Sequence, residues 1–595
     1  MRTKKTTGLQ FAATLLATLV LAACGGGDSS SSAGSTPPGG DTNTQQPPTT
    51  DTDTHPTSYT LTVDLAGLNT GAELVLKDQQ PGSPLDDLYL TEDGSYTFTG
   101  ELKPNDTFDL VIARLAQPTA TLDTDEGVGH APKPRSQCQL TGAEGNAEGT
   151  SQNINVKVEC ETDLVYLHEA LIEDGAGNKD SFWQVWSLNG IEKTLIHQFA
   201  EHELPKYWIV ANDKLLFVTE VLEDGGKIRL QMIDGQGAHV VKEIASPYDY
   251  EFYEHDGKVY LFYQEKYAGN SSLYRVSHEG LVNLAIDTER FEDEGVLVGD
   301  AGVFIWDSRE GLWKLDEESN AFIKVLNLFN TNFVDPINDS DGVGRFIDEV
   351  YMAGDRLYIS AKRALELGTT YTLWTLAAGS NEPEIIQDKM PSEGFSIGSD
   401  FLFFDIRESV LEKINEDGHR ELLLDSSVHF WSIAWDWRGG VVWGDKKYFF
   451  NGKLEEGKPY QVLWAYGEDG IASEVEFAEN HGNYFDLVKS DYYIDSIHRL
   501  HDTVLIKTTD SDPNNNPYYY LLNTNAAGGI VQRQLTTDVS YKAFEAESVA
   551  YMNDQLYFLG AAKVDDSSNN IYDVGLWKAD PDTGVLEAVH TERFQ

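Results

Sequence analysis

The stretch Gly311-Leu312-Trp313-Lys314-Leu315 decides the fold, because it holds one copy of a short pattern that recurs along most of the chain. The pattern is an apolar residue, usually an aromatic residue, then a variable residue and a further apolar residue. Its nine copies begin at Val185, Leu230, Leu273, Leu312, Leu373, Leu411, Leu463, Tyr520 and Leu576. From Trp186 to Trp577 there are 391 residues in eight steps, about 49 per repeat. A repeat of this length is typical of a four-stranded unit packed against its neighbours.

A second element, a turn followed by an apolar run, precedes several copies, as at Asn212–Phe217 and Asn553–Tyr557. Helical periodicity is nearly absent. One unit is expected to hold four strands, near residues 207–211, 215–220, 228–233 and 240–244. Residues 163–595 are therefore predicted to form a β-propeller of eight or nine four-stranded blades. The first copy has no obvious opening strand, so the sequence leaves closure and blade number open, and a stack of separate sandwiches is the alternative. The repeats are broadly similar to lipoprotein and TolB-type propellers with a Leu-Trp/Tyr-x-hydrophobic strand.

Residues 59–162 have short alternating runs and turn signals, which predict a small β-sandwich. The region resembles the Ig-like domains of proteobacterial surface lipoproteins, at Gly67-Leu68, Leu74–Leu76, Gly94–Phe98, Gln117-Pro118, Gln137-Cys138 and Val158–Cys160. The resemblance implies a spacer without chemistry of its own. This chain departs from the family by an insertion, Thr119 to Ser136, and we expect that loop to make contacts of its own.

The amino-terminal residues predict where in the cell the protein is located. A cationic start at positions 2–5 and an apolar run at 9–21, too short to span a bilayer, lead to Leu21-Ala22-Ala23-Cys24. The quartet resembles the bacterial lipobox, which implies a signal peptide at 1–23 and acyl chains on Cys24 that hold the protein on a membrane. Gly25 favours the outer membrane, on its periplasmic or cell-surface side. An ordinary secretory signal is the alternative.

Residues 24–58 are rich in Gly, Ser, Thr and Pro and are expected to form a lipidated, disordered tether. With Cys24 acylated, Cys138 and Cys160 remain. Both lie in one small exported domain, so we expect them to form a disulfide, with a two-cysteine zinc site as the alternative. The chain carries 44 Lys and Arg against 97 Asp and Glu, a net charge of −53. Such a surface excludes nucleic acid as a partner and suits an acidic, solvated coat.

Catalytic motifs are weak. Gly394-Phe395-Ser396-Ile397-Gly398 fits the G-x-S-x-G pattern, but a strand rather than a helix is expected after it, which argues against a nucleophile at Ser396. His197 and His202 lack the H-E-x-x-H spacing of a zinc protease. No phosphate loop or dinucleotide fingerprint is present in the sequence.

Two further groups of residues are candidates for binding. Trp431, Trp435 and Trp437, with Phe430 and Trp443, could stack on a sugar or peptide, although packing between blades is the favoured interpretation. Oxygen donors gather in several loops, among them one with Asp335, Asn338, Asp339 and Asp341 and another with Asp510, Asp512 and Asn514. Calcium takes such oxygens, but none of these loops is complete as a twelve-residue site, and a polar turn is favoured.

The sequence thus favours a membrane-tethered, non-catalytic binding or scaffolding propeller that needs no cofactor, with a protein or polysaccharide as ligand. A surface enzyme that degrades polysaccharide or peptide, with carboxylates at the propeller channel, is one alternative. An outer-membrane assembly factor is the other. Fold alone does not name the ligand.

Overall fold

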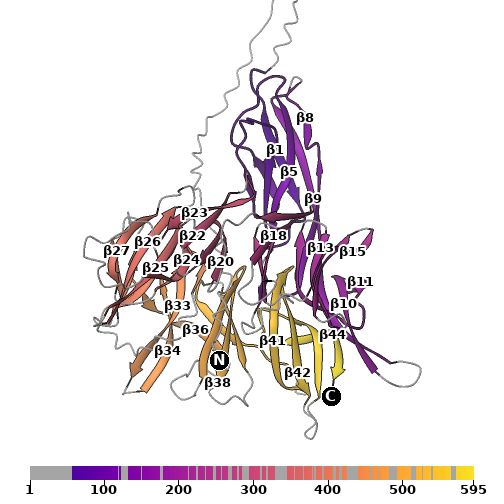
Figure 1. Ribbon diagram of the computed structural model, residues 1–595. Coiled ribbons are helices and arrows are strands. Elements are labelled where there is room, and N and C mark those ends of the chain that lie inside the picture. Colours follow the sequence, from indigo (N-terminus) through magenta and orange to yellow (C-terminus); the bar gives the residue numbers. More distant parts are fainter. Residues whose placement is uncertain are drawn as a thin grey trace, which may run out of the picture.

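The computed structural model describes residues 56–594 apart from stretches between strands, of which the longest are 122–130, 285–293, 328–344, 425–439 and 482–491. The regular elements of this part are all β-strands, which confirms the predicted all-β class (Figure 1). The described residues contain no apolar helix of membrane-spanning length.

The first strands form a small β-sandwich, as predicted. The strands are β1 (Thr60–Ala66), β2 (Glu73–Asp78), β3 (Leu88–Leu90), β4 (Gly94–Thr97), β5 (Thr107–Ala116), β6 (Thr119–Thr121), β7 (Lys133–Thr141), β8 (Glu144–Asn146) and β9 (Asn153–Glu173). One layer joins β4, β1, β9 and β7, and the other has the order β3-β2-β5-β8. Alternate residues of β1, such as Leu61 and Val63, point inward and pack with Leu74, Leu76 and Phe108 from the other layer.

Within the described residues, β9 and the strands after it form nine sheets, which we name R1 to R9. R1 holds β9, β10 (Lys179–Asn189) and β11 (Glu192–Gln198); R2 holds β12 (Glu203–Ala211), β13 (Lys214–Val221), β14 (Lys227–Asp234) and β15 (Gly237–Ile244); R3 holds β16 (Asp249–His255), β17 (Lys258–Gln264), β18 (Ser271–Ser277) and β19 (Gly280–Leu284). R4 holds β20 (Glu294–Gly299), β21 (Gly302–Asp307), β22 (Gly311–Asp316) and β23 (Ala321–Asn327); R5 holds β24 (Arg345–Ala353), β25 (Arg356–Leu365), β26 (Gly368–Ala377) and β27 (Glu384–Met390); R6 holds β28 (Gly394–Ile397), β29 (Asp400–Asp405), β30 (Val410–Ile414) and β31 (Arg420–Leu424).

The series continues to the end of the described chain. R7 holds β32 (Gly440–Trp443), β33 (Lys446–Glu455), β34 (Lys458–Tyr466) and β35 (Ser473–Glu474); R8 holds β36 (Phe477–His481), β37 (Tyr492–Leu500), β38 (Thr503–Asp510), β39 (Tyr518–Thr524) and β40 (Ile530–Gln534); R9 holds β41 (Tyr541–Met552), β42 (Gln555–Val564), β43 (Tyr572–Ala579) and β44 (Leu586–Phe594). In R2 to R9 four consecutive strands pair antiparallel, and in R8 these four are β37 to β40. The first strand of each four lies on the inside of the ring and the fourth on the outside. The four strands expected for one unit correspond to β12–β15.

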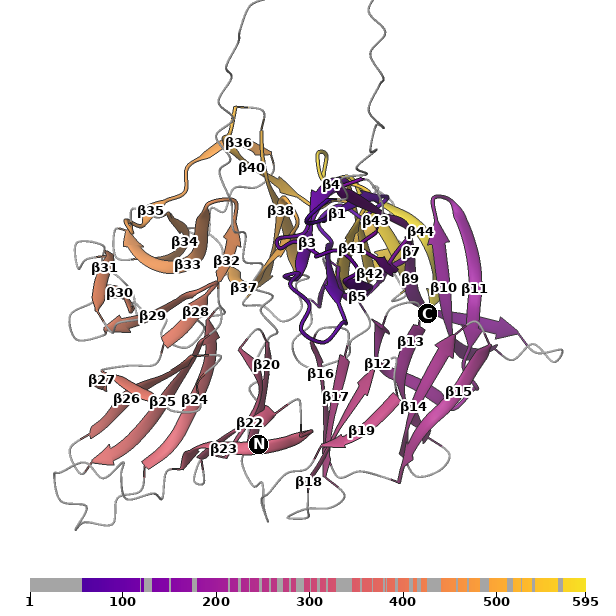
Figure 2. The same cartoon turned by 90° about the horizontal axis from the view of Figure 1, so that it is seen from above.

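The recurring Leu-Trp pattern lies in the third strand of each ring sheet, on β10 in R1 and on β22 in R4. Its side chains pack between sheets: Trp313 is buried in the cluster that joins R3 to R4, and Trp577 in the cluster that joins R8 to R9. Each sheet is joined to the next by such a cluster, and the last cluster packs Tyr166 and Leu188 of R1 against Met552 and Leu576 of R9. The described sheets therefore return on themselves as a ring, with nine sheets rather than eight (Figure 2).

The sandwich lies over one face of the ring (Figure 1). This sandwich face carries the short turns between first and second strands, because the turns at His501 in R8 and Asn553 in R9 touch the sandwich. Neighbouring strands run antiparallel, so first strands begin, and fourth strands end, on the opposite face, which we call the far face. The strand ends that flank residues 328–344 and 425–439 therefore lie on the far face.

Candidate functional site: the junction of the sandwich with the ring

Strand β9 belongs to both parts of the molecule. Its first half pairs with β1 in the sandwich, from Asn153 to Glu159, and its second half pairs with β10 in R1, from Leu164 to Glu173. The strand runs without interruption through the domain boundary that the sequence places after residue 162. A hydrogen-bonded strand is far stiffer than a flexible linker, so the sandwich is fixed to the ring rather than tethered to it.

The insertion between Gln117 and Cys138 joins R9 to R1. Strand β6 pairs antiparallel with β41, placing Thr121 opposite Ser548, and so adds a strand at the inner edge of R9. Strand β7 begins in R1, where Lys133 lies opposite Val165, and then enters the sandwich. The ammonium of Lys133 also lies 5.8 Å from the ring centre of Trp208 in R2. The insertion therefore makes contacts of its own, as expected, and its β7 end takes the place of a first strand in R1 on the side of the sandwich.

An ion pair fixes β7 to R1. The Arg135 guanidinium donates two hydrogen bonds to the Asp163 carboxylate, from Nε at 3.0 Å and from Nη2 at 2.6 Å. Ser187 of β10 donates to the same carboxylate. The side chain of Arg135 is 16% exposed and that of Asp163 is 14% exposed, so water screens this bidentate contact little.

A loop of the sandwich docks on the turns of R8 and R9. The buried Asn69 amide donates to the Tyr551 carbonyl and accepts from the Asn553 backbone N–H, each at 3.3 Å. Gly71 adopts a φ of +79°, and a Cβ there would lie 2.9 Å from Nδ1 of His501 in R8. These contacts hold the sandwich against the ring at a second place, away from β9.

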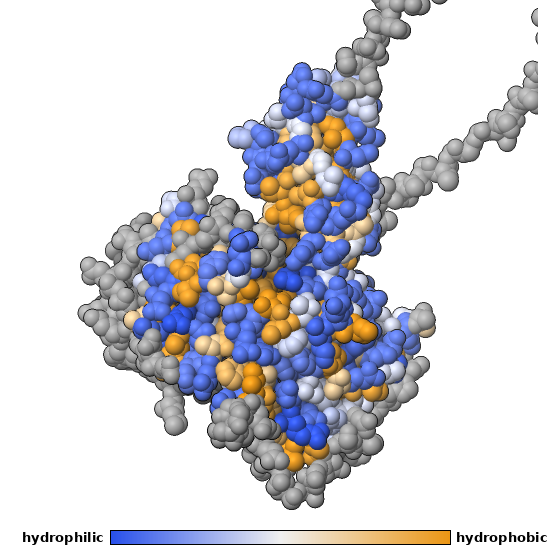
Figure 3. All heavy atoms as spheres, turned by 90° about the vertical axis from the view of Figure 1, so that its right-hand side faces the viewer, coloured by the Kyte–Doolittle hydropathy of each residue, from blue (hydrophilic) through white to orange (hydrophobic). Residues whose placement is uncertain are grey.

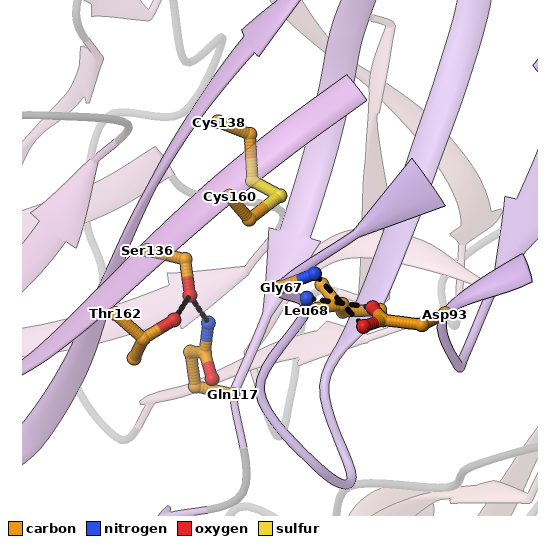
Figure 4. The surroundings of a disulfide bond; sticks show 8 residues. All are labelled: Gly67, Leu68, Asp93, Gln117, Ser136, Cys138, Cys160 and Thr162. Carbon is orange, nitrogen blue, oxygen red and sulfur yellow. Dashed lines mark hydrogen bonds between the residues drawn. A yellow bond between two sulfur atoms is a disulfide. The ribbon is translucent and has the colours of Figure 1, made fainter. Parts of the chain in front are cut away.

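The disulfide predicted from the sequence is present, which confirms the pairing of Cys138 with Cys160 (Figure 4). The two residues lie directly opposite each other on β7 and β9, with 4.0 Å between their Cα atoms. Below the bond, the Ser136 hydroxyl hydrogen-bonds to Thr162 at 2.7 Å and accepts from the Gln117 amide at 2.9 Å. Figure 4 also shows Asp93, which accepts the backbone N–H groups of Gly67 and Leu68 and so fixes the end of β1.

Two stacked histidines lie between R1 and R9. The rings of His168 on β9 and His590 on β44 are 3.9 Å apart, and Nδ1 of His590 is 2.7 Å from the Tyr166 hydroxyl. His168 is 2% exposed, and neither of its ring nitrogens hydrogen-bonds to a described residue. Burial lowers the pKa of His168 to about 3 and that of His590 to about 4, and nearby Lys193 adds to both shifts. Both imidazoles are therefore neutral near pH 7.

Most candidate binding residues from the sequence lie outside the described residues: Cys24, Asp335, Asn338, Asp339, Asp341, Phe430, Trp431, Trp435, Trp437, Asp512 and Asn514. Asp510 ends β38, opposite Tyr492 of β37. Trp443 is a core residue, since it is buried and its indole N–H donates to the Asp502 carbonyl at 3.0 Å.

The weaker catalytic motifs are structural where they are described. Ser396 lies on β28 opposite Phe401 of β29, so its motif is part of a hairpin and not of a strand–helix elbow. His197 packs edge-on against Phe199, and Nε2 of His202 lies 3.9 Å from the carboxylate of Glu201. Nowhere in the described part of the chain do three His, Cys, Asp or Glu side chains gather in a way that could hold a metal ion.

The sequence matches no protein-family model and no curated protein sequence. Among solved structures, a prolyl endopeptidase is similar with a TM-score of 0.34 and 11% identity, covering 66% of this chain and 50% of that one. Tricorn protease gives 0.28 and 12%, covering 72% and 44%. The β-propeller domain of the Trilobed protease from Pyrococcus furiosus gives 0.28 and 12%, covering 62% and 94%. This chain spans half the length of that prolyl endopeptidase and less than half the length of tricorn protease.

Proposed function

We propose that the protein is a lipid-anchored, non-catalytic binding propeller of the bacterial outer membrane, which presents the far face of its ring to a partner. The observation that carries this proposal is the direction of the chain through the sandwich. Strand β1 pairs parallel with β9, and its first residue, Thr60, lies beside Asn153 at the end of the sandwich away from the ring. A chain anchored at Cys24 would therefore reach the molecule at its tip.

In this geometry the sandwich separates the membrane anchor from the ring. Residues 153–162 of β9 separate the tip from the ring, and at about 3.3 Å per residue they span roughly 33 Å. The tether before Tyr59 would add a reach of about 30 Å, from roughly 5–6 Å times the square root of its length. The ring would thus stand clear of the lipid headgroups.

The far face is suited to recognition because long connections between sheets start and end there. Residues 328–344 and 425–439 lie between described strand ends of the far face, and they contain the oxygen-rich loop at Asp335–Asp341 and the aromatic residues near Trp431. Binding residues are carried disproportionately by loops that a rigid scaffold positions. The net charge of −53 favours a neutral or cationic partner over an anionic one.

The first test is attachment. The Cys24→Ser variant is expected to leave the membrane fraction or to accumulate as unprocessed precursor. If it fractionates with the outer membrane like the parent, the anchor is wrong.

The second test is orientation on lipid vesicles that contain an acceptor dye. With Cys24 acylated and Cys138 bonded to Cys160, an introduced cysteine is the one free thiol to label. A donor dye on Ser151→Cys, near the tip, is expected to be quenched more strongly than one on Leu222→Cys, at the turn that follows β13 on the far face. Equal quenching, or the reverse order, would contradict the proposed orientation.

A further inference from the structure

The seam between R1 and R9 is the place where the first and last sheets of the ring meet. We define this seam by Tyr166, His168 and Leu188 of R1 and Met552, Leu576 and His590 of R9. Every other seam of the described ring joins two sheets that follow each other in the chain. In those seams the chain passes from the fourth strand of one sheet to the first strand of the next and limits how far they can separate. The R1–R9 seam has no such limit within the described chain.

The two sides of the R1–R9 seam are held differently. On the inner side, β6 adds to β41 of R9, β7 adds to β9 of R1, and β7 also contacts β41. On the outer side, the described contacts come from side chains: His590 of β44 packs on β9, and the ammonium of Lys193 of β11 donates to the Val589 carbonyl at 3.3 Å. The seam between R8 and R9 is firmer, because the N–H and the carbonyl of Thr536, which follows β40, both hydrogen-bond to the backbone of R9.

The stacked histidines of the seam are poorly placed to carry protons. Their ring centres are 3.9 Å apart, and neither nitrogen of His168, which is 2% exposed, hydrogen-bonds to a described residue. A proton on His168 would therefore be buried without an acceptor. A further proton on His590 would place two cations in contact. A buried charge without a partner is costly, so protonation works against the closed seam.

The elements packed against the pair do not offset this cost. Lys193 of β11 lowers the pKa of both histidines. Strands β10 and β43 bring the uncharged Trp186 and Leu576 to the pair. The other ionisable side chains that these elements turn toward the seam are Tyr166 of β9, Tyr557 of β42 and Glu592 of β44. The carboxylate-bearing residue lies two positions beyond His590 on the same side of β44, roughly 7 Å along the strand.

We propose that acid opens the ring at this seam: protonation of His168 and His590 separates R1 from R9 on the outer side, while β6 and β7 keep the two sheets joined on the inner side. Opening brings water to both imidazoliums and moves them away from Lys193. Because only this seam has to separate, it opens before the rest of the ring unfolds. Figure 3 shows that apolar patches on the side of the ring that carries R1 are separated by hydrophilic surface. The opened seam would add an apolar face that the closed ring does not present there.

Linkage gives the size of the effect. Burial lowers the pKa of His168 to about 3 and that of His590 to about 4, whereas an exposed histidine titrates near pH 6.5. Opening is therefore favoured as the pH falls below about 6.5. Between pH 8 and pH 5, protons on both rings raise the ratio of open to closed molecules roughly a thousandfold. If His168 cannot titrate, the increase over the same range is only about thirtyfold.

The test measures the distance between two spin labels in the Cys24→Ser protein with its disulfide intact. One pair, Ile191→Cys with Val585→Cys, spans the R1–R9 seam at the exposed turns between third and fourth strands. The control pair, Ile191→Cys with Gln236→Cys, spans R1 and R2 at the corresponding turns. Between pH 8 and pH 4 the first pair is expected to gain a longer distance, which disappears on return to pH 8. The distance of the control pair is expected to stay constant.

The His168→Phe variant tests the cause of opening. Phenylalanine keeps a stacked ring but takes up no proton, so the longer distance is expected to appear only at lower pH than in the parent. The matched control, His239→Gln at an exposed position of β15, should behave like the parent. Hydroxyl-radical footprinting of the unlabelled protein is a second measurement. Tyr166, buried in the seam, should become reactive in acid, whereas Trp313, buried between R3 and R4, should stay protected.

Three results of the distance measurements would overturn the inference: an unchanged distance across the seam down to pH 4, equal lengthening of both pairs, or an unchanged pH dependence in His168→Phe. If this variant does not fold, footprinting of the parent decides, because protection of Tyr166 throughout this pH range would also overturn the inference. The inference does not rest on the proposed binding role. The attachment and orientation tests are independent of all these results, so the two proposals fail separately.

Discussion

Removal of the Cys138–Cys160 disulfide measures how firmly the sandwich is joined to the ring. The bond closes a loop of 22 residues, and loop closure of that length stabilises the folded state by about 3 kcal/mol in the chain-entropy model. The double variant Cys138→Ala/Cys160→Ala loses this contribution. The resulting change in melting temperature depends on how much of the chain unfolds together.

Unfolding entropy is about 2.1 cal/mol/K per residue, so a sandwich of roughly 100 residues that melts alone would lose about 14 °C. If the sandwich melts with the whole ring, the same 3 kcal/mol lowers the melting temperature by only about 3 °C. Strand β9 runs through both parts, the Arg135–Asp163 pair lies at their boundary, and Asn69 bonds to R9. We therefore expect one transition, lowered by a few degrees.

The assay is differential scanning calorimetry of the Cys24→Ser protein with and without the disulfide. Non-reducing peptide mapping first verifies that the parent is bonded, and recovery of both cysteines as free thiols under oxidising conditions would remove the premise. A separate sandwich transition whose melting temperature falls by about 14 °C when the disulfide is removed would refute the argument that shared strands couple the two parts. The parent protein treated with a reductant is the matched control.

Three further predictions follow from the junction and the loops. The lowered pKa values of His168 and His590 mean that the unfolded chain binds protons that the folded chain does not. The free energy of unfolding is therefore highest above about pH 6.5 and falls as the pH drops toward 4, with a loss of about 2 kcal/mol at pH 5 from His168 alone. In urea melts at several pH values, His168→Gln should flatten this dependence on pH. The exposed control His239→Gln should not. Arg135→Ala should cost about 2 kcal/mol by leaving a largely buried carboxylate without its cation, and an unchanged urea midpoint would exclude this role. Millimolar calcium should raise the melting temperature by a few degrees more than sodium chloride of equal ionic strength; if it does not, or if the shift persists in Asp339→Ala/Asp341→Ala, that loop is only a polar turn.

The repeated units could be predicted from the sequence because their signals are local. Four alternating runs and a Leu-Trp pattern every 49 residues or so identify the strands, and the strands expected for one unit match β12 to β15 within a few residues at each end. Even the turn at Asn553-Asp554 is visible, since both residues adopt positive φ, at +51° and +58°, as Asn and Asp do most readily. The same reasoning placed the pattern's aromatic residues in the core, where Trp313 and Trp577 are buried.

Ring closure could not be predicted, because it depends on pairings between distant parts of the chain. The missing opening strand of the first repeat was visible, but nothing in its local pattern shows that Lys133 to Arg135 take that place opposite Asp163 to Val165. Thr119 to Thr121 carry no strong strand signal, and their partner in R9 lies more than 400 residues away. The stacked His168 and His590 are likewise separated by the whole ring. Hydrophobic periodicity reports which face of a strand is buried and is silent about which strand lies beside it.

The closure of the ring explains why the insertion of the sandwich matters. R9 is built from the last four strands of the chain, and R1 begins with β9, so no sheet of the described ring combines a first and a last strand to hold the two ends together. Instead, β6 adds to R9 and β7 adds to R1, and both belong to one segment that enters from the sandwich. The disulfide fixes the sandwich end of β7 to β9. The sandwich therefore holds in place the segment that joins the last sheet to the first. A domain whose family resemblance implies only a spacer is thereby part of the ring's closure.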